Sequence, residues 1–327
     1  MKAAVCGRYG PPEVVQISEV PTPVPADGEV LIRAHATTVN SGDARIRAAR
    51  FPRGLGPLVR LRLGLTKPRQ AVLGFEMAGE VEAVGSAVTG VQPGDRVVAS
   101  RGFGFGCHAE YLTVAEQGGS IAPIPDAMSY EDAVSLCFGG STALYFFRQA
   151  ELAEGETVLV NGASGGVGTM AVQLARHFGA EVTAVCSDAN ASLVEDLGAD
   201  RVIDYATDDF TRDGRRYDVI MDTHGNAPYG RIKGSLRPGG RFLMVVGGLW
   251  SMISGSWQKA TIGGTQNDPA ALADDYRTLM SLAERGELRP VIDAVLPFEQ
   301  VVEAHRRVDS GHKVGSVVLT FDRDEPG

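Results

Sequence analysis

The sequence is 327 residues long, about twice the usual length of one domain, so we expect two domains. Hydrophobic residues make up 44% and charged residues 22% of the chain, a balance that excludes a disordered or fibrous protein. Thirty-one Lys and Arg against 40 Asp and Glu give a net charge of −9, which disfavours nucleic acid and anionic membrane surfaces as partners.

The cysteines and the apolar runs bear on the compartment. Cys6, Cys107, Cys137 and Cys186 are scattered without a Cys-x-x-Cys pair, which is typical of a reducing compartment. The first residues carry no apolar signal region, and no stretch approaches the roughly 20 apolar residues of a membrane span. We therefore expect a cytoplasmic protein that is neither exported nor inserted into a membrane.

Short β-rich runs broken by glycine and proline fill the chain up to about residue 125, a pattern typical of a barrel or sandwich. The expected strands are 3–6, 14–20, 29–40, 78–84, 95–99 and 109–114. Over 126–150 the apolar residues recur three and four apart, which predicts a helical connector into a second domain.

Strands and helices alternate from Thr157 onward, which predicts a parallel, doubly wound sheet. The expected strands are 157–161, 181–186, 201–204, 218–221 and 241–246, and the expected helices are 167–178 and 191–197. A tail of helix 270–284, turn 285–290, helix 299–308 and strand 314–319 is expected to pack back on the first domain. The predicted domains are 1–125 with 266–327, and 126–265.

A glycine-rich loop, 162–168, joins the strand 157–161 to a helix. This is the context of the dinucleotide fingerprint Gly-x-Gly-x-x-Gly, in which the helix N-terminus faces the pyrophosphate. Gly165 lets the backbone approach that group and Gly168 allows close helix packing, whereas Ala163 stands in place of the first glycine. The predicted cofactor contacts of the loop are Ala163, Ser164, Gly165, Gly166, Val167 and Gly168.

Two other catalytic motifs compete with this interpretation. The loop also matches Gly-x-Ser-x-Gly, the nucleophile elbow of hydrolases, and Asp222 and His305 follow Ser164 in the hydrolase order. The extra third glycine and the β-rich leading domain disfavour that hypothesis. Tyr229 and Lys233 match the Tyr-x-x-x-Lys pair of short-chain reductases, but those enzymes carry their glycine loop at the N-terminus.

Several stretches together resemble the medium-chain dehydrogenase/reductase superfamily, in its zinc-free, zeta-crystallin-like quinone oxidoreductase branch. They are Val39-Asn40-Ser41-Gly42-Asp43, Gly74-Phe75-Glu76-Met77-Ala78-Gly79-Glu80-Val81, Val91 to Val97, Ala109-Glu110-Tyr111, the glycine loop, Gly198 to Tyr205, and Gly311 to Gly315. The resemblance runs nearly end to end. It implies an α/β fold with a GroES-like β-rich catalytic domain and a Rossmann domain.

Zinc ligands are missing from the positions that the resemblance indicates. The catalytic Cys and His of zinc alcohol dehydrogenases in this superfamily fall near Asn40 and at Phe75, and no lobe of four cysteines follows Arg96. Cys107 and His108 are adjacent, so on a strand their side chains point to opposite faces. Tetrahedral zinc needs three or four suitably spaced ligands, so we predict no metal.

Without zinc to activate an alcohol, the resemblance implies an acceptor that is already electrophilic, a quinone or a conjugated carbonyl. Asn40 and Asp43 are the candidate catalytic residues. Asn40 would donate a hydrogen bond to the oxygen that gains negative charge during hydride transfer, although Asn there also suits a turn cap. Asp43 is expected to order the loop, and water or a nearby side chain to deliver the proton.

The resemblance makes Ser187 and Tyr205 contacts of the adenosine phosphate, which favours NADPH. Ala189 stands where relatives often carry Arg, and Asp188 adds negative charge, so NADH stays possible. The other contacts carried over are Thr142, Val246, Gly247 and Ser316. Thr142 equally suits an ordinary helix cap.

These features predict a zinc-independent, NADPH-dependent reductase of a small quinone or enone, and the family resemblance implies a homodimer. Two alternatives stay open. One is an NADPH-binding protein without turnover, a role that zeta-crystallin in the lens shows to be open to this fold. The other is a serine hydrolase that uses Ser164.

Overall fold

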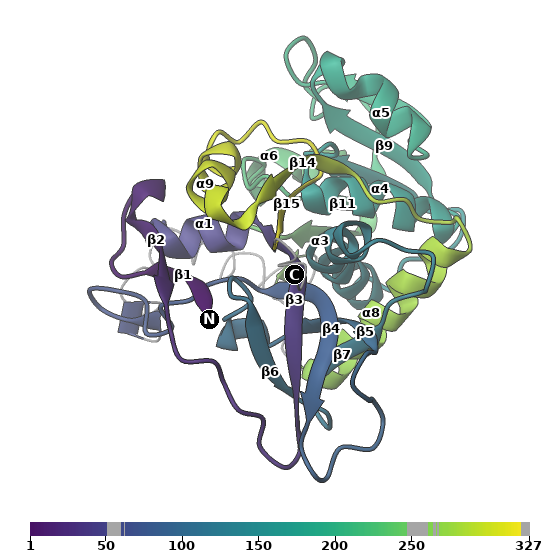
Figure 1. The fold of residues 1–327 in the computed structure, drawn as a ribbon. Helices are drawn as coiled ribbons and strands as arrows, with labels where there is room; N and C mark the ends of the chain where they lie inside the picture. Colours follow the sequence, from purple (N-terminus) through teal and green to yellow (C-terminus); the bar gives the residue numbers. More distant parts are fainter. Residues whose placement is uncertain (51–59, 62, 247–260, 264–265, 267, 322–327) are drawn as a thin grey trace. The chain divides into compact units, whose positions relative to one another are not determined.

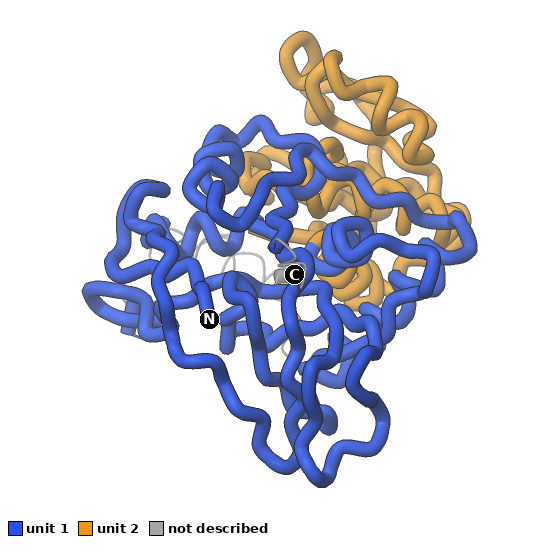
Figure 2. Tube along the Cα trace, viewed as in Figure 1, with its two compact units in different colours: residues 1–51, 56–138, 267–327 blue, residues 52–55, 139–266 orange. Residues whose placement is uncertain are grey.

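The computed structural model describes residues 1–50, 60–61, 63–246, 261–263, 266 and 268–321 (Figure 1). The chain forms two compact units (Figure 2). The first unit holds the described residues up to Phe138 and those after 267, so both ends of the chain belong to it, and the second holds the described residues of 139–266. The helix α3 (Tyr130–Gln149) runs across this division. The predicted limits of 125 and 265, which rest on the change in the apolar pattern, stay a prediction.

The first unit is built on a seven-stranded sheet of order β14-β15-β3-β4-β5-β7, with β6 also paired to β3. Its strands are β3 (Glu29–Val39), β4 (Glu76–Val84), β5 (Arg96–Ser100), β6 (Tyr111–Ala115), β7 (Ser120–Pro123), β14 (Ile292–Pro297) and β15 (Ser316–Thr320). The strand β15 pairs antiparallel with β3, which confirms that the tail returns to the N-terminal sheet. A separate hairpin joins β1 (Lys2–Cys6) to β2 (Val15–Glu19).

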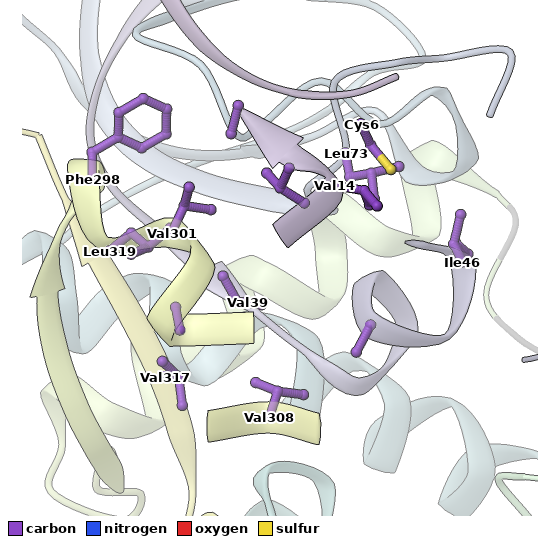
Figure 3. Packing of buried hydrophobic residues seen from close by; sticks show 14 of the residues in the cluster. Cys6, Val14, Val39, Ile46, Leu73, Phe298, Val301, Val308, Val317 and Leu319 are labelled. Atoms are coloured by element: carbon purple, nitrogen blue, oxygen red, sulfur yellow. The ribbon is translucent and has the colours of Figure 1, made fainter. Parts of the chain in front are cut away.

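Both ends of the chain also build one hydrophobic core of this unit. Figure 3 shows how side chains from the N-terminal strands, α1 (Ser41–Arg47) and the C-terminal α9 (Val301–Asp309) pack together. The labelled residues are Cys6, Val14, Val39, Ile46, Leu73, Phe298, Val301, Val308, Val317 and Leu319. Removing these apolar side chains from water fixes the tail against β3 and α1, the elements that meet at Asn40. The helix α8 (Pro269–Glu284) lies against β7, where the Ser120 hydroxyl donates to the Pro269 carbonyl at 3.0 Å.

The second unit holds a six-stranded sheet of order β10-β9-β8-β11-β12-β13, and every pair in it is parallel. Its strands are β8 (Thr157–Asn161), β9 (Glu181–Cys186), β10 (Arg201–Asp204), β11 (Tyr217–Asp222), β12 (Leu236–Met244) and β13 (Thr261–Gly263). Its helices include α4 (Gly166–His177), α5 (Ala191–Asp196) and α6 (Tyr229–Ile232). The chain thus combines a β-rich unit with a unit built on a doubly wound parallel sheet, which confirms the predicted fold class.

Several elements differ from the sequence-based expectation. The helix α1 and the strands β7, β13 and β14 were not predicted, and β6 begins two residues later than the expected strand 109–114. The helix α1 carries only seven residues, three of them charged, so it lacks an apolar period. Short 3-10 turns complete the described chain at Pro12–Val14, Gly102–Gly104, Asp188–Asn190, Lys233–Ser235 and Phe298–Gln300.

Candidate functional site

The glycine loop follows β8 at the point where the order of the parallel strands reverses. From β8 the chain moves to β9 on one side, and β11 lies on the other side. Ligands of open α/β sheets bind at such a switch point, outside the carboxyl ends of the strands. The sheet therefore places the loop where a dinucleotide binds in this architecture.

The first turn of α4 offers backbone N–H groups to an anion. Gly165 is the N-cap, with φ −78° and ψ 174°, and among the described residues no side chain caps the helix. The first N–H groups of a helix have no partner within it, and its dipole adds positive potential there. Val167 lies in this first turn, and Gly166 begins it.

Two glycines of the loop have different surroundings. A Cβ on Gly168 would lie 2.1 Å from the Gly162 carbonyl oxygen, so only glycine fits this close contact between helix and loop. A Cβ on Gly165 would meet its nearest atom, the same oxygen, at 3.6 Å, which leaves room on that side of the loop. The close contact at Gly168 holds the helix against the loop, and the open space at Gly165 lets a pyrophosphate approach the backbone.

Asn190 connects two predicted cofactor residues. Its amide donates to the Ser164 hydroxyl at 3.2 Å and to the Ser187 hydroxyl at 3.1 Å. Because the amide is the donor in both bonds, each serine keeps its own proton for a further acceptor such as a phosphate oxygen. Asn190 was not predicted as a site residue, although it lies in the short turn that directly follows Ser187.

The remaining predicted contacts of the second unit lie on several elements. Tyr205 follows β10, its side chain is 60% exposed, and its N–H donates to the Cys186 carbonyl at 3.1 Å, so it lies at the same sheet edge as Ser187. Val246 follows β12, and Gly247 lies outside the described residues. Thr142 lies inside α3, so the expectation that it caps a helix is wrong.

The surroundings of Asp222 and His305 do not favour the hydrolase hypothesis. Both carboxylate oxygens of Asp222 already accept bonds at 2.9–3.1 Å, from the Asn161 amide and from the backbone N–H groups of His224, Gly225 and Ala227. These bonds hold the turn that follows β11, a structural role of Asp222 that needs no histidine. His305 belongs to the first unit, where it is fully buried with its ring centroid 6.0 Å from that of His108.

In the first unit, Asn40 is the N-cap of α1. Its side-chain oxygen accepts from the backbone N–H groups of Gly42 and Asp43 at 2.8 and 3.1 Å, and the Asp43 carboxylate accepts from the Asn40 N–H at 3.0 Å. This reciprocal capping box fixes which side of the amide carries the NH₂ group. Asn40 therefore does cap the helix, as the alternative interpretation expected. The cap uses only the side-chain oxygen and leaves the NH₂ group available as a donor.

The NH₂ group of Asn40 faces Glu76, at the start of β4. Its nitrogen lies 3.5 Å from Glu76 Oε1, which also accepts a bond from the Thr38 hydroxyl. An amide carries two protons, so one donor remains after this contact. Glu76 lies in the stretch 74–81 that carries the family resemblance, but no role was predicted for it. In the structure it holds the NH₂ side of the Asn40 amide.

Asp43 and Glu76 form a buried acidic pair. Asp43 accepts from the Gly74 N–H at 3.0 Å, and its Oδ2 lies 3.9 Å from His108 Nε2. Burial raises the pKa of Asp43 despite the nearby His108 and these backbone donors. Burial, followed by the charge of Asp43, raises the pKa of Glu76 to about 8. This shift of the pKa favours the protonated form of Glu76 at neutral pH.

This raised pKa predicts a pH-dependent stability. Between the ordinary glutamate pKa of 4.5 and the folded value of about 8, the folded chain binds a proton that the unfolded chain releases. The free energy of unfolding therefore falls as the pH rises through this window, by up to about 1.4 kcal/mol per pH unit. We expect urea unfolding from pH 5 to 8 to show this slope in the wild type and a flatter one in Glu76→Gln. Parallel profiles would contradict it.

The metal positions of zinc relatives hold no ligand set. Phe75 offers no donor atom, and the Asn40 oxygen is used by the helix cap. Cys107 is fully buried, which raises its thiol pKa well above the usual value, while the neighbouring His108 contacts the Thr38 carbonyl at 2.9 Å. Among the described residues, no group of three His, Cys, Asp or Glu side chains is arranged to hold a metal ion.

Ser316 and Tyr229, the latter from the disfavoured short-chain reductase motif, have structural contacts. Ser316, in the first unit, donates its hydroxyl to the Ser135 carbonyl at 3.1 Å. Tyr229 packs against the core of the second unit, with its ring centroid 6.3 Å from that of Phe242.

In the described part of the chain, no helix is long and apolar enough to cross a membrane.

Comparison with known proteins gives the class. Residues 26–126 match the alcohol dehydrogenase GroES-like domain, and residues 197–319 match a family described as zinc-binding dehydrogenase. A quinone oxidoreductase of Pseudomonas aeruginosa is 32% identical over 95% of this chain and 97% of its own. A chloroplastic NADPH-dependent alkenal/one oxidoreductase of Arabidopsis thaliana is 30% identical over 98% of this chain and 79% of its own.

The solved structure of the quinone oxidoreductase from Coxiella burnetii superposes with a TM-score of 0.87, at 29% identity, over 98% of this chain and 99% of its own. The match therefore includes both units and both ends of the described chain. The chain belongs to the medium-chain dehydrogenase/reductase superfamily, in its quinone oxidoreductase branch. It is an oxidoreductase that binds a nicotinamide cofactor.

Proposed function

We propose that the protein reduces quinones or α,β-unsaturated carbonyls with NADPH and without a metal ion. The observation that carries this proposal is the oriented amide of Asn40, held between the α1 cap and Glu76 where zinc relatives place a ligand. A hydrogen-bond donor stabilises an oxyanion but does not activate an alcohol as zinc does. The acceptor must therefore be electrophilic before it binds.

The chain's own groups divide the remaining work. When bound, the reduced nicotinamide supplies a hydride, and the acceptor also takes up one proton. The glycine loop and the hydroxyls of Ser164 and Ser187 bind the phosphates of the cofactor. The remaining N–H of the Asn40 amide donates a hydrogen bond to the substrate oxygen that gains negative charge. The proton comes from water or from a nearby side chain, of which Glu76, with its raised pKa and its contact with the Asn40 amide, is the candidate.

We propose NADPH rather than NADH. The hydroxyls of Ser187 and Tyr205 follow adjacent strands, and both suit a 2′-phosphate, which NADH lacks. The name of the Arabidopsis relative specifies NADPH. The assignment is tested by titrating NADPH and NADH into the wild type and into Ser187→Asp. The new carboxylate repels the 2′-phosphate of NADPH but accepts hydrogen bonds from the ribose hydroxyls of NADH, so the variant should favour NADH. Equal affinities of the wild type for both cofactors would overturn it.

The function is tested by NADPH oxidation with a panel of quinones and enones. We expect turnover with several members of the panel, at a rate that added zinc or a chelator leaves unchanged. Tight NADPH binding without turnover would instead favour a binding protein. Loss of activity with the chelator would contradict the metal-free mechanism.

Asn40→Ser separates the capping role from the donor role. Serine is a good N-cap, so α1 and the fold are retained, but the NH₂ group is lost. We expect kcat to fall about 100-fold, the usual cost of one oxyanion donor, with little change in the NADPH Kd. A kcat within about threefold of wild type would exclude Asn40 as the donor, since mutational losses at such sites are much larger.

We further propose that the protein is a cytoplasmic homodimer. The proposal rests on the family resemblance and on the scattered, buried free cysteines of the described chain. Analytical ultracentrifugation tests the dimer, and fractionation of the source cells tests the compartment.

A further inference from the structure

An aromatic cluster lies next to Asn40 in the first unit. Phe75 is its centre, with ring centroids 4.9 Å from Phe105, 5.6 Å from Phe138 and 5.9 Å from Phe103. The rings meet edge to face or tilted, the arrangements that aromatic pairs prefer. These contacts fix the rings relative to one another.

The cluster is only partly covered. Phe105 is 3% exposed, whereas Phe75 and Phe138 are half-buried and Phe103 is 44% exposed. An exposed phenylalanine is unfavourable in water, and here it extends a surface formed by other partly exposed rings. This arrangement indicates a surface that a ligand covers.

The backbone that carries Phe103 and Phe105 is held in an uncommon conformation. It is the segment Gly102-Phe-Gly-Phe-Gly106, in which Phe105 has φ +48° although it is not glycine. Hydrogen bonds hold the segment, from Gly102 N–H to the Ser100 hydroxyl at 2.9 Å and from Gly106 N–H to the Leu73 carbonyl at 3.2 Å. Such strained residues cluster at functional sites because the surroundings must maintain them.

Phe75 connects these rings to the candidate donor. A Cβ on Gly42 would lie 2.9 Å from Phe75 Cε2 and 2.9 Å from the Asn40 side-chain oxygen. The ring edge and the amide therefore flank the same glycine. The aromatic cluster therefore adjoins the Asn40 side chain on the side of its oxygen.

We propose that Phe75, Phe103 and Phe138 form a binding platform for the fused aromatic ring of a bicyclic quinone, and that Phe103 determines the preference for such substrates over small aliphatic enones. The inference rests on the proposed function and narrows its substrate class. Ring-on-ring contacts add to the burial of apolar area, and an aliphatic enone has no ring to make them.

The test compares 1,4-naphthoquinone with methyl vinyl ketone in the full-length protein. In Phe103→Ala we expect kcat/KM for naphthoquinone to fall about tenfold through KM, and that for methyl vinyl ketone to change less than about twofold. Phe103→Tyr should restore the preference, because it keeps the ring. Val295→Ala removes a side chain of similar exposure, 50%, on β14 and should change neither value. Equal losses for both substrates would overturn the platform.

A binding measurement keeps this inference separate from the proposed function. Calorimetric titration of 1,4-naphthoquinone into protein saturated with oxidised cofactor requires no turnover. We expect the Kd to rise about tenfold in Phe103→Ala and to return to the wild-type value in Phe103→Tyr. An unchanged Kd would overturn the platform, whereas ring-dependent binding without turnover would overturn only the proposed reductase.

Discussion

Gly165→Asp is expected to weaken NADPH binding by about 100-fold or more while leaving the protein folded. The backbone of Gly165 already has the conformation of an N-cap, and Asp is among the preferred N-cap residues. Its carboxylate would accept the N–H groups of α4 that a phosphate needs. A like charge about 4 Å from the pyrophosphate costs roughly 4 kcal/mol at the effective dielectric of a protein surface, which exceeds the free energy of a 100-fold change.

Measurement of the NADPH Kd together with the melting temperature separates binding from folding. In Gly165→Asp the Kd should rise and the melting temperature without cofactor should stay level or increase, because the new cap stabilises α4. Gly168→Ala is the matched variant, since its Cβ would lie 2.1 Å from the Gly162 oxygen and destabilise the unit itself. If Gly165→Asp bound NADPH as tightly as wild type, the loop would not be the phosphate site.

Five of the six strands of the parallel sheet, all but β13, were predicted from the sequence, and there is a physical reason for this. Fully buried parallel strands require apolar runs, and a crossover helix requires a glycine where it approaches the strand, so Gly168 and the alternation after Thr157 both appear in the sequence. Ser187 and Tyr205 follow the second and third strands of this alternation. Because those strands are parallel neighbours, both residues were expected at the same edge of the sheet.

The catalytic unit was less predictable because its site depends on contacts distant in sequence. Glu76 receives its high pKa from burial and from Asp43, 33 positions earlier in the chain, and no local pattern shows that pair. Likewise Phe75, Phe103 and Phe138 meet only when three separate elements come together. The capping box of Asn40 and Asp43 was the one local signal present, and it would have indicated α1.

Asp309→Asn is expected to destabilise the first unit by about 3–5 kcal/mol, because it removes the partner of a buried charge. Arg47 is fully buried on α1, and it donates to Asp309 on α9 at 2.5 Å and to the Gly10 carbonyl at 2.7 Å. The pair thus connects the helix capped by Asn40 to the C-terminal helix. Without the carboxylate, the guanidinium keeps only neutral acceptors, the Gly10 carbonyl and the new amide oxygen, which compensate poorly for lost hydration.

Scanning calorimetry should show a melting temperature lowered by roughly 6–20 °C, the shift that such a loss produces in a unit of about 200 residues. Arg306→Gln is the control, since its ion pairs with Glu13 and Glu303 are exposed and worth little. Adding Arg47→Met to Asp309→Asn should recover much of the loss, because the buried charge is then gone. If Asp309→Asn melted no lower than Arg306→Gln, the buried pair of Arg47 and Asp309 would not be what holds α1 against α9.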